Sequence, residues 1–362
     1  MDKSYDILII GGGPAGASAA KASAAKGAKV LLIDKKKDPG FPVQCAELIT
    51  QWIFHHIDLP SRSIVQKIEN LITHLPDGSC FKMRSPGFMI DRSIFDKELL
   101  IQAALKGTQI SMATKAIELY PDGVLIERER KKGFINSKII IGADGTNSIV
   151  SKWIGEPSLK KIHTIQAEVV LFEKSLDAEI FFDKLFEGGY AWFFPKGNRA
   201  NIGIGITSLK FRNLSKLLNQ FLGNLKNLGK LPRVEILSKT GGLIPCETRK
   251  RIYHNNILLV GDAAGHAHPI TGAGIFNAIV GGEIAGRISA EAIQKGDLNH
   301  LKNYEIEWEG IFGKALAYGS TKRSFLEDNW NNSEIDFQSL IRSSWIGFKE
   351  YYKDRKGTCY GE

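Results

Sequence analysis

The residues best suited to chemistry near the start of the chain are three closely spaced glycines and an aspartate. Gly11, Gly13 and Gly16 follow a short apolar run, and Asp34 follows a second one. Glycines at this spacing allow a tight turn and let the backbone approach a pyrophosphate, while the next helix offers its free N–H groups to the anion. A carboxylate after the second run can accept hydrogen bonds from ribose hydroxyls. The pattern predicts a dinucleotide site. Asp34 would repel a 2′-phosphate, so NADP is disfavoured, and these residues leave FAD and NAD open.

A strand, a helix and a second strand are needed to position these groups. The run 5–10 is rich in Ile and Leu and suits a strand buried on both faces. Pro14 fits the first helical turn, and the Ala-rich segment 15–26 favours a helix. The run 29–33 reads as the second strand. We therefore expect an α/β, Rossmann-like fold, in which the nucleotide contacts Gly11, Gly13, Pro14, Ala15, Gly16, Asp34 and Lys35.

In two later segments, an expected apolar strand is also followed by an aspartate next to a glycine. One is GADG, which contains Asp144, and the other is VGDAAG, which contains Gly261 and Asp262. A helix is expected to open just after Gly272, and its N-terminus would accept negative charge. FAD is long enough to use such distant stretches, because its ribityl chain and flavin ring extend beyond the pyrophosphate. Asp262 could accept hydrogen bonds from ribityl hydroxyls, so these segments favour FAD over NAD.

The segment YAWFFPKGNRANIGIG, residues 190–205, suits an apolar ligand. On a strand, Tyr190, Trp192 and Phe194 point to one face. A two-residue hairpin turn would set Trp192 opposite Gly203 and Tyr190 opposite Gly205. The aromatic rings would then form a wall, and the missing side chains opposite would leave a slot. An apolar slot beside a flavin suits an isoprenoid chain; the alternative is ordinary core packing of a sheet.

The three nucleotide segments together resemble the FAD-binding pattern shared by aromatic hydroxylases of the p-hydroxybenzoate hydroxylase type and by geranylgeranyl reductases. DRSIFD, residues 91–96, is similar to an FAD-contacting arginine motif of that superfamily, and residues 190–205 resemble the YxWxFP(x7)GxG signature of geranylgeranyl reductases. The resemblance implies a Rossmann-like FAD-binding domain with an inserted antiparallel β-sheet substrate domain and a helical C-terminal region. It implies further FAD contacts at Cys45, Ala46, Arg92, Asp144, Gly261, Asp262, Gly272, Ala273, Gly274 and Ile275, and substrate contacts at Tyr190, Trp192, Phe194, Pro195, Gly203 and Gly205.

The resemblance also selects candidate catalytic residues. Cys45 matches a cysteine that polyprenyl reductases place near the flavin, although Ala46-Glu47 follows it where relatives have Gly-Glu. The alternative for Cys45 is inert packing. We expect Cys45, Tyr190 and Trp192 to carry the catalytic roles. His266 and His268 are expected to form loop hydrogen bonds, with proton donation as the alternative and no metal site. The expected units are 1–75, 91–155 and 241–298 for the FAD-binding domain, 76–90 and 156–240 for the substrate domain, and 299–362 for the helical C-terminal region.

The function implied is saturation of prenyl double bonds, with hydride delivered from reduced FAD to an unactivated alkene. The substrate would be a prenyl-chain lipid or other isoprenoid, and the electrons would come from NAD(P)H or a ferredoxin-like protein. One alternative is a hydroxylase or halogenase that uses oxygen, although the WxWxIP signature of halogenases is missing from the sequence. Another alternative is an FAD electron carrier or quinone oxidoreductase that reduces no alkene.

Composition bounds these expectations. The chain has 362 residues, a formal net charge of +9, 43% hydrophobic and 24% charged residues, which is ordinary for a soluble two-domain protein. Its basic residues are not interleaved with aromatics, so no nucleic-acid partner is expected. Four dispersed cysteines without a CxxC motif suggest neither zinc nor disulfides and fit a reducing cytoplasm. We expect no signal peptide and no membrane-spanning helix. The basic surface and the aromatic C-terminal region would suit docking at an anionic membrane on the cytoplasmic face.

Overall fold

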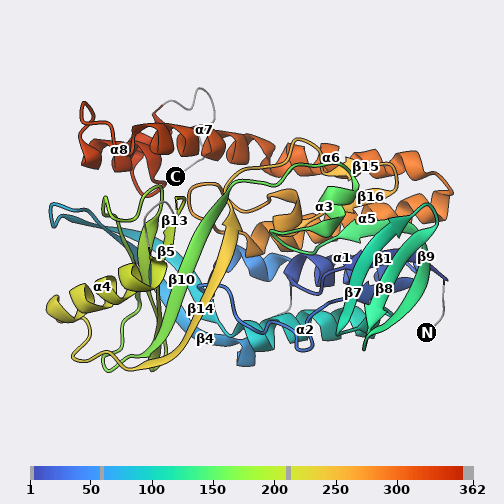
Figure 1. Cartoon of the computed structure of the whole chain (residues 1–362), viewed down its shortest axis with the longest axis horizontal. Coiled ribbons are helices and arrows are strands. Elements are labelled where there is room, and N and C mark those ends of the chain that lie inside the picture. Colours follow the sequence, from blue (N-terminus) through green and yellow to red (C-terminus); the bar gives the residue numbers. More distant parts are fainter. Residues whose placement is uncertain (1–3, 58–60, 209–212, 354–362) are drawn as a thin grey trace.

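Two eight-stranded sheets form the framework of the computed structural model, which describes residues 4–57, 61–208 and 213–353 (Figure 1). The strands are β1 (Ser4–Ile10), β2 (Val30–Ile33), β3 (Leu48–Thr50), β4 (Ile64–His74), β5 (Cys80–Ile90), β6 (Gln109–Ser111), β7 (Thr114–Tyr120), β8 (Gly123–Arg128), β9 (Lys131–Gly142), β10 (Lys161–Val170), β11 (Asp177–Phe181), β12 (Tyr190–Lys196), β13 (Arg199–Ile206), β14 (Ile236–Pro245), β15 (Tyr253–His254) and β16 (Ile257–Leu259).

Helices flank these sheets. The longer ones are α1 (Pro14–Ala25), α2 (Arg92–Leu105), α3 (Ile149–Trp153), α4 (Leu214–Asn227), α5 (Ile275–Lys295), α6 (Asn303–Trp308), α7 (Lys314–Asn329) and α8 (Phe337–Ser344). Shorter helical turns are η1 (Gln51–His55), η2 (Ser61–Ser63), η3 (Gly261–Ala264), η4 (Leu298–Lys302), η5 (Glu309–Gly313) and η6 (Lys349–Tyr352). Asp91 caps α2 by accepting hydrogen bonds from the N–H groups of Ser93 and Ile94.

The first sheet brings the three predicted nucleotide segments together. Its strand order is β15-β16-β9-β1-β2-β6, and β1, β2, β6, β9 and β16 run parallel. The strands β1, β2 and β16 are almost entirely buried, which explains their nearly continuous apolar runs. Backbone hydrogen bonds continue past the strand ends, from Ala143 to Ile10 and from Val260 to Gly142. The loops after β1, β9 and β16 therefore meet at one edge, where α/β sheets bind ligands.

Small residues let the helices α1 and α5 pack closely against each other beside this sheet. A Cβ added at Gly282 would lie 2.2 Å from the carbonyl oxygen of Ala15, and one at Gly286 would lie 2.2 Å from that of Ala19. Because the two helices are so close, the hydroxyl of Ser23 on α1 donates a hydrogen bond to the carbonyl of Gly286 on α5 at 3.0 Å. Because side chains larger than hydrogen would separate the helices, these positions fix where α5 begins relative to the nucleotide edge.

The second sheet is mostly antiparallel, with strand order β14-β10-β13-β12-β11-β4-β5-β3. One face packs against α4, whose Leu218, Phe221 and Leu225 are buried. The other face packs against α7 and α8, which run along the top of the molecule in Figure 1. The β12–β13 hairpin has the predicted register: Trp192 pairs with Gly203, Tyr190 with Gly205 and Lys196 with Arg199.

Three expectations need correction. The strands β3 and β4 lie in the second sheet, so the first FAD-binding segment ends before residue 48 and not at 75. The strand β14 crosses the boundary expected at 240, because its whole length pairs with β10. The aromatic side chains of the C-terminal region are largely buried against the second sheet, as at Trp330 and Trp345, and therefore do not form a membrane-docking surface. Cys359 and the last residues of the range 299–362 lie outside the described part of the chain.

Candidate functional site

The loop after β1 leaves open space at the start of α1. A Cβ at Gly13 would meet nothing within 4 Å, and no side chain caps the helix there. Gly11 and Gly16 have a different role, because a Cβ at Gly11 would lie 2.2 Å from the Ala143 carbonyl oxygen and one at Gly16 would lie 1.9 Å from that of Gly11. Two glycines thus allow the turn, and the third leaves room at an uncapped helix N-terminus, as a pyrophosphate requires.

The Asp34 carboxylate holds this turn from the neighbouring strand. Its Oδ2 accepts a hydrogen bond from the N–H of Gly12 at 2.6 Å, and its Oδ1 accepts one from the N–H of Lys36 at 2.7 Å. Asp34 is half-buried and Lys35 is exposed. The carboxylate therefore links the ends of β1 and β2, next to the expected position of the ribose.

Asp144 and Asp262 lie on the loops that meet β1. Asp144 Oδ2 accepts hydrogen bonds from the N–H groups of Ile149 and Val150, while its buried Oδ1 has no partner among the described residues. Asp262 Oδ2 accepts a hydrogen bond from Thr146 at 3.2 Å. Burial raises the pKa of both carboxyl groups. An orphaned buried oxygen at this edge is the kind of group that a polar ligand satisfies.

The N-terminus of α5 faces the same edge without a side-chain cap. Its N-cap is Gly274, and Gly272 just before it has φ +68°. The preceding loop is held by histidines, as the sequence predicts: His266 Nδ1 accepts from the N–H of Gly261, and His268 Nδ1 accepts from the N–H of Ile270 and Thr271. Burial lowers the pKa of His266 to about 3 and that of His268 to about 4, so both rings are neutral at pH 7.

These features fit FAD. Two uncapped helix starts, the open space at Gly13 and the orphaned oxygen of Asp144 all lie on loops at one sheet edge. The full set of cofactor contacts stays a prediction: Gly11, Gly13, Pro14, Ala15, Gly16, Asp34, Lys35, Cys45, Ala46, Arg92, Asp144, Gly261, Asp262, Gly272, Ala273, Gly274 and Ile275.

A network of hydrogen bonds fixes Cys45 over the second sheet. The Gln166 side chain donates to the Cys45 carbonyl at 3.1 Å and accepts from the indole N–H of Trp192 at 3.1 Å. The Cys45 Sγ accepts from the N–H of Glu47 at 3.3 Å. Burial raises the pKa of this thiol, and the nearby Arg92 partly opposes the rise. Ala46 has no positive φ, so the alanine in place of the family's glycine causes no backbone strain.

Glu47 anchors the same loop through buried charge. Its Oε2 accepts from Lys196 Nζ at 2.5 Å and from the Asn201 side chain at 2.8 Å, and its Oε1 accepts from the N–H of Arg92 at 2.8 Å. Glu47 is 2% exposed and Lys196 is 3% exposed. The Arg92 guanidinium itself forms two hydrogen bonds with Asp96 and lies beside Cys45. Glu47 and Lys196 lie in or beside the predicted motifs, but their pairing joins segments far apart in the sequence and was not predicted.

The aromatic strand forms the expected wall, but the slot opposite it is filled. The Trp192 indole occupies the space over Gly203, where an added Cβ would lie 2.2 Å from Cζ2 of the ring. Phe194 and Pro195 are buried, with Phe194 in the sheet core. Tyr190 Oη donates to the Thr271 carbonyl at 2.5 Å and so joins this wall to the loop before α5.

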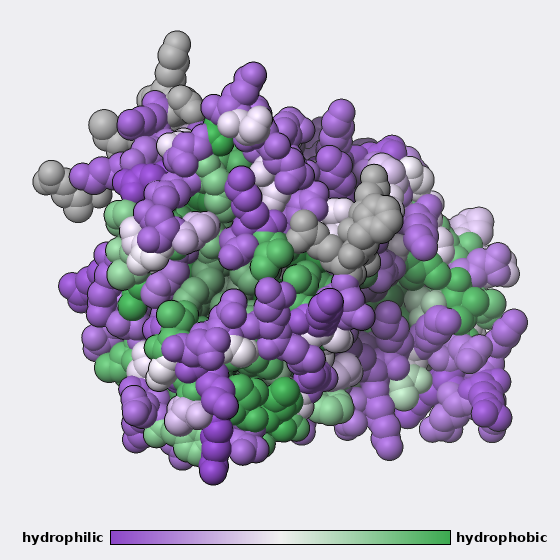
Figure 2. Space-filling view, turned by 60° about the vertical axis from the view of Figure 1, so that its left-hand side comes forward, coloured by the Kyte–Doolittle hydropathy of each residue, from purple (hydrophilic) through white to green (hydrophobic). Residues whose placement is uncertain are grey.

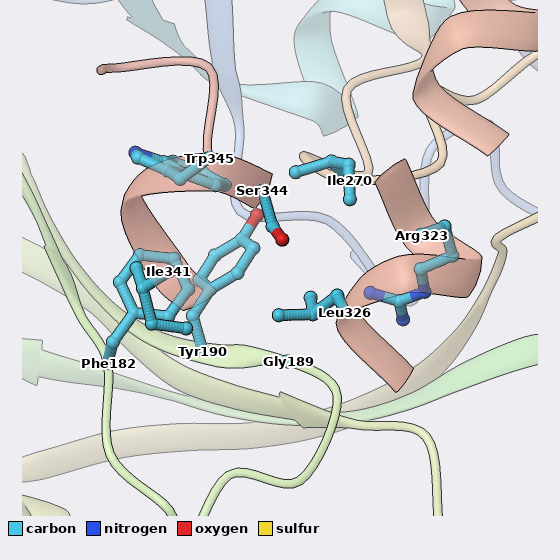
Figure 3. Close-up of a pocket in the computed structure, with 9 residues that line it drawn as sticks. All are labelled: Phe182, Gly189, Tyr190, Ile270, Arg323, Leu326, Ile341, Ser344 and Trp345. Carbon is cyan, nitrogen blue, oxygen red and sulfur yellow. The ribbon is translucent and has the colours of Figure 1, made fainter. Parts of the chain in front are cut away.

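Of the predicted substrate residues, only Tyr190 lines the cavity drawn in Figure 3. Sequence reasoning missed the remaining walls, which come from the loop between β11 and β12, the loop before α5, α7, and the C-terminal end of α8 with Trp345. Trp345 carried a visible signal as one of several C-terminal aromatics, whereas the others belong to no motif. The missed residues are Phe182, Gly189, Ile270, Arg323, Leu326, Ile341, Ser344 and Trp345.

The surface in Figure 2 is mostly polar, with apolar side chains gathered between the polar ones. Exposed large apolar side chains include Phe41, 62% exposed, and Trp52, 60% exposed. Within the described ranges no helix combines the length and apolar character that crossing a membrane requires.

Comparisons with known proteins agree with this geometry. Residues 163–244 match a family model described as the geranylgeranyl reductase catalytic domain, and residues 5–87 match one described as pyridine nucleotide-disulphide oxidoreductase. A digeranylgeranylglycerophospholipid reductase 2 from Methanococcoides burtonii is 34% identical, covering 94% of this chain and 91% of the relative. A digeranylgeranylglycerophospholipid reductase from Methanocaldococcus jannaschii is also 34% identical, with 92% and 89% covered.

Solved structures show the same architecture. A geranylgeranyl bacteriochlorophyll reductase-like protein from Thermoplasma acidophilum superimposes with a TM-score of 0.85 at 26% identity, covering 95% of this chain and 92% of that one. A flavin-dependent brominase has a TM-score of 0.75 at 18% identity, with 95% and 96% covered, which shows a shared fold alone. The chain therefore belongs to the geranylgeranyl reductase family of FAD-dependent oxidoreductases, which act on carbon–carbon double bonds.

Proposed function

We propose that the substrate is a lipid whose geranylgeranyl-type chains are joined to glycerophosphate, and that this FAD-dependent reductase saturates their double bonds. The relatives named digeranylgeranylglycerophospholipid reductase support this substrate class. The observation that carries the proposal is the hydrogen bond from Tyr190 to the Thr271 carbonyl. It joins the aromatic strand of the family signature to the loop that precedes α5, so an apolar chain against Tyr190 would lie next to a loop proposed to hold FAD.

When bound and reduced, FAD supplies the hydride. The protein's own residues bind the chain, exclude water and hold a proton. Trp345 packs edge to face with both Tyr190 and Phe182, and the rings of Phe182 and Tyr190 are tilted against each other. The three rings give an apolar wall. Such a wall suits a substrate with no polar group near the reacting bond.

Cys45 is the proposed source of the proton. Burial raises the pKa of its thiol, so Sγ keeps its proton at neutral pH. Its sulfur accepts from Glu47, which leaves the S–H to point elsewhere. Tyr190 is less suited, because its O–H is already directed at the Thr271 carbonyl. Trp192 positions Cys45 through Gln166 and does not line the cavity.

The decisive test is an anaerobic assay with the purified FAD-loaded protein. The protein is reduced with dithionite, and a geranylgeranyl glycerophospholipid is then added. We expect products that have gained two hydrogen atoms for each saturated bond, and mass spectrometry measures this gain. Oxygen-dependent consumption of NAD(P)H with an aromatic substrate would instead indicate a hydroxylase or halogenase. Electron exchange with a quinone but no alkane product would indicate an electron carrier. Replacing dithionite by NAD(P)H or by a reduced ferredoxin identifies the natural class of electron donor.

Membrane contact is a separate proposal. Trp52 on η1 and Phe41 expose much of their rings, and the chain carries a net charge of +9. Such side chains suit insertion into a lipid interface, and the positive charge suits an anionic surface. Co-sedimentation with anionic vesicles is expected to fall in Trp52→Ser and to be unchanged in Leu105→Ser, which replaces an even more exposed apolar residue, on α2. Equal binding of both variants would contradict this surface.

A further inference from the structure

The cavity beside Tyr190 is lined by both apolar and polar side chains (Figure 3). The rings of Phe182, Tyr190 and Trp345 and aliphatic groups such as Leu326 make up its apolar lining. Arg323 on α7 and Ser344 on α8 are its polar side chains; Figure 3 shows Ser344 beside Trp345 and the guanidinium of Arg323 directed toward the enclosed space. The free space measures about 10 Å³, room for one water-sized group.

Arg323 is a buried cation whose hydrogen-bonding groups are only partly satisfied. It is 4% exposed, and its Nε lies 2.8 Å from Oε1 of Glu327, one turn further along α7. Its buried Nη2 has no hydrogen-bond partner among the described residues. A buried charge with an unmet donor is costly, because the desolvation of that nitrogen is not compensated. The neighbouring Lys322 is also buried, at 5% exposure, which adds positive charge to the same stretch of α7.

Ser344 supplies a second, independent signal. It is 1% exposed, and within the described residues its Oγ has no partner. Two buried donors from different helices, both unsatisfied and both lining one cavity, indicate a missing acceptor between them. The acceptor that matches a guanidinium and a hydroxyl is an anionic oxygen.

We propose that Arg323 and Ser344 bind one phosphoryl oxygen of the prenyl lipid's head group. The available room accepts one oxygen atom, so the remainder of the head group lies outside this cavity. The phosphoryl group belongs either to a glycerophospholipid or to a prenyl diphosphate, since both place an anionic oxygen close to an isoprenoid chain. The inference rests on the proposed function only for the prenyl part of the ligand.

The test compares three ligands that differ in their head group: a digeranylgeranylglycerophospholipid, geranylgeranyl diphosphate and neutral geranylgeraniol. Binding is measured by calorimetry on the FAD-loaded protein, and KM is measured in the anaerobic assay. Arg323→Met is expected to weaken binding of phosphorylated ligands about 10-fold or more, as the loss of a charge-assisted hydrogen bond implies, and to leave geranylgeraniol within about 2-fold. Ser344→Ala is expected to act in the same direction with a smaller effect. The preferred phosphorylated ligand distinguishes the two sources.

Arg287→Met is the matched control. Arg287 also forms an ion pair with a glutamate one turn later, Glu291, but lies on α5 and does not line this cavity. It is expected to leave all three affinities unchanged. Arg323→Lys should recover part of the phosphorylated ligand's affinity, which separates lost charge from misfolding. Equal weakening of all three ligands in Arg323→Met, or no weakening, would overturn the inference. If the wild type binds the phosphorylated ligands through Arg323 but reduces none, the proposed function fails while this site stands.

Discussion

The indole of Trp192 lies directly over Gly203 on the neighbouring strand, so that a Cβ there would approach Cζ2 of the ring to 2.2 Å. The same Cβ would lie 2.7 Å from the carbonyl oxygen of Ile165 on the opposite side. The second glycine, Gly205, is also close to the indole, with an added Cβ 3.8 Å from Cζ3. The glycines of the family signature therefore seat a tryptophan, which in turn donates to Gln166 beneath Cys45.

Gly203→Ala is expected to lower the free energy of unfolding by about 1–3 kcal/mol, because the methyl group overpacks a site closed by a ring and by backbone. Urea unfolding measures the change. Gly223→Ala on α4 is the control: an added Cβ there meets nothing within 4 Å, so alanine should stabilise the helix by about 0.5–1 kcal/mol. Equal stability of Gly203→Ala and the wild type would show that Trp192 does not occupy this position.

Lys196→Met is expected to destabilise the protein by about 3–5 kcal/mol, because it leaves the buried carboxylate of Glu47 without its cation. The measurement is again urea unfolding. Lys82→Met breaks an exposed pair with Asp177 and is expected to cost less than about 1 kcal/mol. Similar losses in the two variants would mean that water reaches Glu47 and screens its charge.

The parts of the structure that the sequence predicts are those with local patterns. The glycine turn at Gly11, the acidic loop residues and the register of the aromatic hairpin follow from spacing within short segments, and the sheet then places them. The strand β4 was assigned to the wrong sheet because its alternating run fits either sheet. What decides its place is pairing with the distant strand β11, which no local spacing encodes.

The sequence predicts candidate residues for the cofactor, but it does not predict most residues that line the cavity beside Tyr190. The cofactor residues lie in motifs, whereas Arg323, Ser344 and Phe182 reach the cavity through the packing of α7, α8 and the loop after β11. The slot was wrongly expected to be open, since spacing shows that glycines face a tryptophan but not that the indole folds over them. Burial of the C-terminal aromatics likewise depends on which sheet face they cover.

Acid is expected to destabilise the fold through His266. Its pKa is lowered from 6.5 to about 3 by burial, so between these values the unfolded chain binds a proton that the folded protein does not. The contribution of His266 to the free energy of unfolding is therefore fully present above pH 6.5. It is lost as the pH falls toward 3, at up to about 1.4 kcal/mol per pH unit. His268, with a pKa of about 4, adds a loss of the same sign.

The measurement is the free energy of unfolding at pH 7 and at pH 5. His266→Gln keeps an acceptor for the Gly261 N–H but does not titrate, so its stability should fall less steeply than that of the wild type. A His266→Gln slope equal to that of the wild type would mean that this ring is protonated in the folded protein.

Cys45→Ala is expected to lower kcat by about 10²- to 10⁴-fold, the range for loss of a positioned proton donor, while FAD binding is retained. Tyr190→Phe removes an O–H that is directed at the Thr271 carbonyl, so its main effect should be on stability, about 1–3 kcal/mol, for the unsatisfied carbonyl. Cys80→Ala replaces an exposed cysteine and should leave kcat unchanged.

Burial raises the Cys45 pKa above its ordinary value of 9.0, so the wild-type rate should hold through neutral pH and fall only as pH rises past 9.0. If Tyr190→Phe loses turnover and Cys45→Ala does not, the proton comes from the tyrosine, and the geometry at Thr271 must change when substrate binds.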